Sequence, residues 1–172
     1  MTDSVSCRIL PITPCQLAQW LPRLGSLLYL HAAMARAAAD EFPARMLVAQ
    51  WALAPLLTTC WLVAASAVTD EGPHEWCECV DRAGCIRASL HLLPDTDYLA
   101  WDELTTAKKA RRVPPEVQAS PSFRADGASV VSFRLREFAG SMLLEQCAAG
   151  SLSSCGSQVA ERIARVASVA LL

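Results

Sequence analysis

HEWCECVDRAGCIRASLHLL, residues 74–93, is the stretch whose pattern decides the fold. In its second half the apolar side chains occupy every second position, at Ile86, Ala88, Leu90 and Leu92. A period of two is typical of a strand with one buried face. Residues 81–84, Asp-Arg-Ala-Gly, separate that strand from 74–80 and have the composition of a hairpin loop. The stretch therefore predicts an antiparallel β-hairpin.

This hairpin also holds the candidate metal ligands of the chain. The residues whose side chains suit zinc or an iron–sulfur centre are His74, Cys77, Cys79, Cys85 and His91. If Cys85 pairs with the residue before the turn, Glu78 faces Arg87, Cys77 and Cys79 point inward, and His74 faces His91 on the outer side. One ion could not then reach all the ligands without breaking the hairpin. We expect the cysteines to pack in the core and no cofactor to be bound; the alternatives are a metal site or a pH-sensitive histidine pair.

The residues before the hairpin carry helix signals. Thr13-Pro14-Cys15-Gln16 matches a capping box with proline at the first helical position, and an apolar stripe follows over 24–39. Met46 to Val68 has no charged residue and is long enough to span a bilayer, but its polar residues and Pro55 favour a buried helix, or two helices meeting at Pro55. We therefore predict a helical part over 1–70.

The residues after the hairpin favour further strands and a final helix. Val131, Phe133 and Leu135 alternate with polar residues, Met142 to Ala148 follows an Ala-Gly turn, and a helical stripe begins near Ser157. The basic, proline-rich stretch 107–122 predicts an exposed loop. The expected fold is a single α+β domain over 1–172. Its N-terminal helices pack on one face of an antiparallel sheet of about four or five strands within a β-rich part, 74–172, that ends in a C-terminal helix.

Composition limits the function classes. The chain has 172 residues, of which 53% are hydrophobic and 19% charged, and a net charge of −2. This composition argues against disorder, and the charge gives no basic face for nucleic acid. The eight cysteines occur without a signal-peptide pattern at the N-terminus, so we expect reduced thiols and a cytoplasmic location.

No motif for catalysis stands out. The chain has no Gly-x-Ser-x-Gly elbow and no glycine-rich phosphate loop. Its apolar excess must be buried somewhere, and a partner or a second copy of the chain is the simplest place. We therefore expect a non-enzymatic protein-binding module, an adaptor or a secretion-type chaperone, which binds another protein or forms a homodimer. The candidate partner-binding residues are Trp76, Trp101, Lys108, Lys109, Arg111 and Arg112.

One stretch suggests a different class. Val48-Ala49-Gln50-Trp51, the internal Pro55 and the strands expected from Trp76 to Leu93 together resemble the N-terminal portion of the ferric-siderophore reductase family. That resemblance implies an iron–sulfur cluster held by a late cysteine array with an adjacent pair and a Cys-x2-Cys. Here only Cys147 and Cys155 occur late, and neither fits that array. An iron- or metal-linked redox protein is thus the alternative function.

Overall fold

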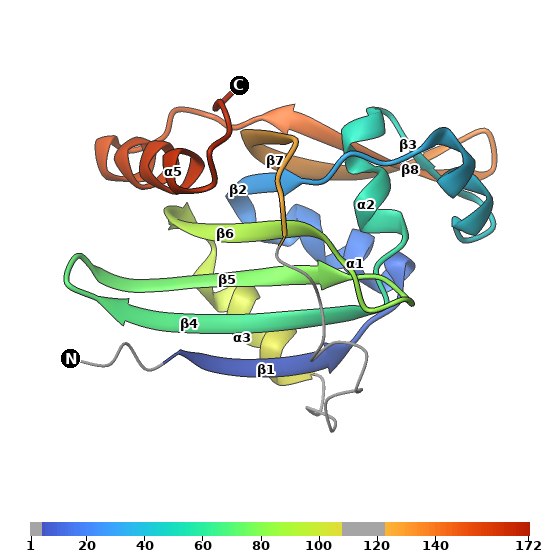
Figure 1. Ribbon diagram of the computed structural model, residues 1–172. Helices are drawn as coiled ribbons and strands as arrows, with labels where there is room; N and C mark the ends of the chain where they lie inside the picture. Colours follow the sequence, from blue (N-terminus) through green and yellow to red (C-terminus); the bar gives the residue numbers. More distant parts are fainter. Residues whose placement is uncertain (1–4, 108–122) are drawn as a thin grey trace.

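One mixed sheet runs through both halves of the chain (Figure 1). A computed structural model describes residues 5–107 and 123–172, and in these residues eight strands pair in the order β1-β4-β5-β6-β2-β7-β8-β3. The strands are β1 (Ser6–Pro11), β2 (Gly25–His31), β3 (Met46–Val48), β4 (Trp61–Thr69), β5 (Gly72–Val80), β6 (Ile86–Thr96), β7 (Gly127–Phe138) and β8 (Ser141–Ala148). All neighbouring pairs are antiparallel except β3 with β8.

Short helices cover the two faces of the sheet unequally (Figure 1). They are α1 (Pro14–Trp20), α2 (Ala54–Leu57), α3 (Tyr98–Ala107) and α5 (Ser154–Val166), with 3-10 turns η1 (Leu21–Arg23), η2 (Arg36–Glu41) and η3 (Trp51–Leu53). Side chains of α1, α2 and α3 pack into one large apolar cluster with the sheet, on what we call the closed face. Helix α5 packs on the opposite face, the α5 face, through a smaller cluster.

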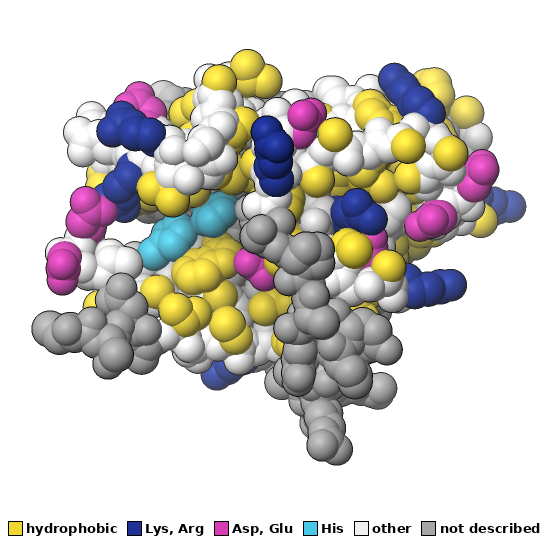
Figure 2. All heavy atoms as spheres, in the orientation of Figure 1, with side chains coloured by type: hydrophobic (Ala, Val, Ile, Leu, Met, Phe, Trp, Pro, Cys, Tyr) yellow, Lys and Arg dark blue, Asp and Glu magenta, His cyan; other side chains and the backbone are white. Residues whose placement is uncertain are grey.

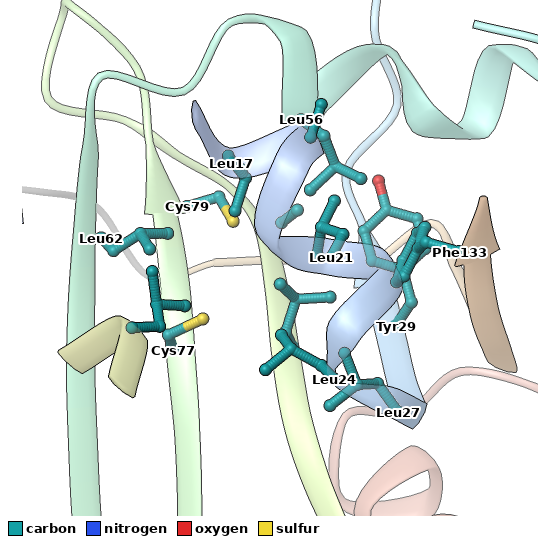
Figure 3. Packing of buried hydrophobic residues seen from close by; sticks show 14 of the residues in the cluster. Leu17, Leu21, Leu24, Leu27, Tyr29, Leu56, Leu62, Cys77, Cys79 and Phe133 are labelled. Carbon is teal, nitrogen blue, oxygen red and sulfur yellow. The ribbon is translucent and has the colours of Figure 1, made fainter. Parts of the chain in front are cut away.

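Leucines dominate the closed face (Figure 3). Leu17, Leu21 and Leu62 are at most 1% exposed and pack with Cys77 and Cys79 from β5. Figure 3 shows these side chains converging between the short helices and the strands. The expectation that the two cysteines pack in the core agrees with this arrangement.

The predicted fold class is wrong in its first half. Residues 24–39 and 46–68 form β2, β3 and β4 with only short helical turns between them, so the sheet has eight strands rather than four or five. β2 lies between the two clusters, with Leu27 on the closed face and Leu28 on the α5 face, both fully buried. A strand buried on both faces has no polar alternation, so its pattern cannot be distinguished from that of a buried helix.

The alanine-rich composition of β4 misled the prediction in a second way. Ala65 lies directly opposite Trp76, and Ala67 lies opposite His74. Small side chains at these positions leave room for large rings on the neighbouring strand. Packing across the sheet therefore outweighs the helix propensity of alanine.

Local patterns were predicted correctly. Thr13 and Gln16 form the capping box of α1, the hairpin β5–β6 is present, and the strand expected over Met142 to Ala148 is β8. The predicted register of β5–β6 is wrong by two residues, because Cys77 pairs with Leu90 rather than Ala88, and Glu78 pairs with Ser89 rather than Arg87. A shift of two keeps Cys77, Cys79 and the histidines on their predicted faces.

The remaining expectations concern a membrane-spanning helix and the loop 107–122. No helix in residues 5–107 or 123–172 is long and apolar enough to cross a membrane. Apart from its first residue, the predicted loop 107–122 lies outside the described residues.

Candidate functional site: a groove beneath helix α5

Helix α5 is fixed to the sheet at its N-terminus. The Ser153 backbone N–H and its hydroxyl each donate a hydrogen bond of 2.9 Å to the Asp95 carboxylate on β6. Ser153 in turn caps the helix, accepting from the Gly156 N–H at 3.0 Å. A side chain at position 156 would overlap Asp95, so only glycine fits at this contact. The first turn of α5 is therefore bound closely to the end of β6.

Two further contacts hold the middle of α5. Its Ala160 and Ala164 pack against Leu28 and Leu30 of β2. Arg162 forms an ion pair with Glu71 in the β4–β5 turn. Fixed at these points, α5 leaves a space between itself and strands β5 and β6.

That space is a groove made of two adjoining cavities. The larger has a volume of about 590 Å³ and the smaller about 310 Å³. Both are lined by Trp76, His91, Ile163 and Val166, so the two cavities lie side by side. The remaining lining residues are Leu30, Thr69, Asp70, Glu71, His74, Glu78, Ser89, Phe123, Arg162 and Ala167. Figure 2 shows histidine side chains beside hydrophobic ones on this face.

Three aromatic rings form the floor of the groove. His74 and Trp76 alternate on β5, and Trp76 pairs with His91 on β6, so all three project from the α5 face. Their ring planes lie within 19° of one another. His74 Nε2 lies 3.1 Å from His91 Nδ1, and His91 Nε2 lies 3.1 Å from the Ser89 hydroxyl. The floor is thus a group of three stacked aromatic rings with nearly parallel planes, beside a hydrogen-bonded row of polar groups.

Both floor histidines are neutral at pH 7. Burial, and then the neighbouring His74, lowers the pKa of His91 to about 3. Burial, and then Arg162, lowers the pKa of His74. With one proton on each ring, one imidazole donates its N–H to the other, and His91 either accepts from Ser89 or donates to it. Positive charge on the pair is disfavoured by its surroundings.

Glu78 brings a carboxylate to the inner end of the groove. It lies two residues after Trp76 on the same face of β5 and is half-buried. Burial raises the pKa of Glu78, and a hydrogen bond with the Trp76 side chain partly opposes that effect. Among the described residues no cation forms an ion pair with it. An acidic group in a half-buried place without a cation is a costly arrangement.

The structure brings together only two of the five candidate metal ligands. His74 and His91 meet in the groove, whereas Cys77 and Cys79 lie on the closed face. Cys85 is half-buried in the hairpin turn, where its backbone N–H donates to Asp81. In the described ranges no group of three or more histidine, cysteine, aspartate or glutamate side chains is arranged to hold a metal ion.

The candidate partner-binding residues lie in different surroundings. Trp76 lies in the groove, half-buried. Trp101 is only 3% exposed and donates from its indole nitrogen to Glu75 at 2.6 Å, which leaves it little surface for a partner. Four others, Lys108, Lys109, Arg111 and Arg112, lie outside the described residues.

Sequence reasoning missed several groove residues. Glu78 shares the alternation of His74 and Trp76, so the same pattern could have placed it beside them. Ile163 and Val166 were predicted as part of an apolar stripe, but no local signal indicated where α5 lies on the sheet. Its position depends on the contact of Asp95 with Ser153, which are distant in sequence.

A larger cleft of about 890 Å³ lies elsewhere, between η2 and the β5–β6 turn. Its lining among the described residues includes neither histidine nor an aromatic ring. Its Arg87 is already paired with Asp81 at 2.7 Å. The groove beneath α5 therefore offers the more specific chemistry.

Comparison with known proteins adds no functional assignment. No protein-family model matches the chain, and no curated protein has a significantly similar sequence.

Proposed function

We propose that this protein is a non-enzymatic protein-binding module and that the groove beneath α5 receives a segment of its partner. The observation that carries the proposal is the pair of adjoining cavities between α5 and the sheet, which aromatic and aliphatic side chains line together. Val166 at the edge of this groove is 83% exposed. Aromatic side chains with an apolar body and a polar edge are the usual anchors of protein interfaces.

Binding accounts for the groove better than catalysis does. The row Ser89–His91–His74 has the order of a nucleophile, a base and an orienting group. However, a base with a pKa of about 3 accepts a proton poorly at neutral pH, and Ser89 is only 3% exposed. The row thus serves as a fixed, neutral floor rather than as a proton-transfer device.

The test is a selection of peptides in which one variant blocks the groove. Random heptapeptides displayed on phage are panned against the wild-type chain, and selected clones are assayed on Val166→Trp. Because Val166 is exposed, the added ring fills the groove without disturbing the core. Leu99→Trp on α3 is the matched control, since Leu99 is 78% exposed on a helix of the closed face.

We expect clones that bind the wild type and Leu99→Trp equally and bind Val166→Trp at least tenfold more weakly. If every selected clone binds Val166→Trp as well as the wild type, the groove is not the binding site. Sedimentation of the wild type and of Val166→Trp, each without peptide, distinguishes a partner protein from a second copy. Self-association through the groove would give a wild-type dimer and a monomeric Val166→Trp variant.

A further inference from the structure

We propose that the groove recognises an arginine side chain in an extended partner segment, with the guanidinium stacked on Trp76 and paired with the Glu78 carboxylate. This inference rests on the proposed function and names the chemistry of the partner. It uses the charge, the burial and the ring geometry of the groove floor.

The charged side chains that line the groove favour a cationic ligand. Among the described residues, the acidic side chains of the lining are Asp70, Glu71 and Glu78, and the basic one is Arg162. Arg162 is already paired with Glu71. In the described part of the chain, neither Asp70 nor Glu78 forms an ion pair with a cation. The described lining of the groove therefore carries a net negative charge, and a basic ligand complements it.

Glu78 sets the position of that cation. Burying a carboxylate is costly unless a positive group compensates it, and the raised pKa of Glu78 reflects that cost. Its side chain lies on the same face of β5 as the Trp76 indole, and the Cα atoms of these alternate residues are about 7 Å apart along the strand. A cation resting over the indole is thus within reach of the carboxylate.

The stacked rings favour a guanidinium over an ammonium group. The planes of Trp76, His74 and His91 are nearly parallel, differing by 16–19°, so a further planar group can add to the stack. Guanidinium stacks on aromatic faces and pairs with a carboxylate through two N–H groups, which an ammonium group cannot do. The two imidazoles are neutral at pH 7 and so do not repel it.

The aliphatic wall indicates a peptide rather than a small cation. Ile163 and Val166 face the same space as Trp76, from the opposite side of the groove. An apolar residue next to the arginine would bury its side chain against them. The occupant we infer is therefore an extended segment with an arginine flanked by aliphatic residues.

The experiment measures fluorescence polarisation with a defined probe, fluorescein-Gly-Leu-Arg-Leu-Gly amide. Its counterpart carries citrulline, which has the shape of arginine without its charge. We expect the citrulline peptide to bind the wild type at least tenfold more weakly, because a charge-assisted contact is lost. On Glu78→Gln the two peptides should bind almost equally. The control Glu137→Gln, on an exposed glutamate of β7, should keep the full difference.

The outcomes separate this inference from the proposed function. Equal binding of the arginine and citrulline peptides, or an unchanged difference on Glu78→Gln, overturns the arginine contact. Phage clones that depend on the groove but are not enriched in arginine would also overturn the arginine contact. In that case the proposal of a protein-binding module would still hold. Competition by N-acetyl-arginine amide as strong as by the peptide would show a small-cation site and overturn the peptide segment. A complete lack of clones sensitive to Val166→Trp overturns both proposals.

Discussion

Leu90 and His91 are consecutive residues of β6, yet they belong to opposite faces of the sheet with different physical roles. Leu90 is 1% exposed within a core of leucines and cysteines beneath three helices. His91 lies half-buried in an aromatic and acidic groove that a single helix covers in part. The closed face carries well-packed apolar contacts, and the α5 face carries polar groups whose burial is only partly compensated. The same strands therefore pack into a core on one side and line a groove on the other.

Removing a core side chain should have the largest effect. Leu90→Ala should lower the free energy of unfolding by about 2–5 kcal/mol, because it leaves a cavity on the closed face. Val166→Ala on the α5 face should change it by less than about 0.5 kcal/mol, since Val166 is 83% exposed. Urea unfolding of both variants measures the difference. Similar losses in the two variants would mean that the faces do not differ as described.

Acid should destabilise the protein through the α5 face. The folded-state pKa of His91 is about 3, below its ordinary 6.5, so the unfolded chain binds the proton more readily as the pH falls below 6.5. The contribution of His91 should therefore lower the free energy of unfolding by about 2 kcal/mol between pH 7 and pH 5, and the free energy should fall further towards pH 3.

Replacing His91 tests that prediction. His91→Gln should remove most of this pH dependence, while His31→Gln should keep it because the pair of His74 and His91 is intact. Urea unfolding at a series of pH values measures both. An acid loss of the same size in His91→Gln would assign the effect to other groups.

Two aspartates anchor opposite faces and allow a paired test. Asp95 accepts two hydrogen bonds from Ser153 before α5, whereas Asp97 accepts from the Ala100 N–H in the first turn of α3 at 3.0 Å. Asp95→Ala and Asp97→Ala should each destabilise the protein by about 1–2 kcal/mol. Amide exchange should accelerate in α5 only for Asp95→Ala and in α3 only for Asp97→Ala. Faster exchange of both helices in either variant would contradict separate anchoring.

The smallest expected effect is a gain in stability. Because the folded-state pKa of Glu78 is raised, ionisation costs stability as the pH rises above its ordinary value of 4.5. Glu78→Gln should therefore stabilise the free protein at pH 7 by less than about 1 kcal/mol, and the gain should vanish below pH 4.5. Thermal unfolding at both pH values measures it. A loss of stability at pH 7 would show that Glu78 has a compensating cation in the free protein.

The fold was predictable where the pattern is local. The capping box of α1 and the alternation in β5, β6 and β7 depend on residues close in sequence. β2 and β4 were not predictable, because helices or large rings cover them from parts of the chain that are distant in sequence. Leu27 and Leu28 illustrate this, because each is buried in a different cluster. In the sequence, the two together have the pattern of the apolar stripe of a helix.

The candidate site was predictable in part. The hairpin prediction placed His74 opposite His91, and although the true register pairs Trp76 with His91, His74 still reaches His91 as a diagonal neighbour. The groove itself depends on where α5 packs, which the contact of Asp95 with Ser153 and Gly156 determines. That α5 belongs above β5 and β6 is tertiary information that no local pattern in the sequence contains.

Amide hydrogen exchange with and without the arginine pentapeptide tests the central claim most directly. A partner segment in the groove should slow exchange in α5 and in strands β5 and β6, and leave α1 and α3 unchanged. Slower exchange confined to the helices of the closed face, or no change in α5 at a saturating peptide concentration, would contradict the assignment of binding to the α5 face.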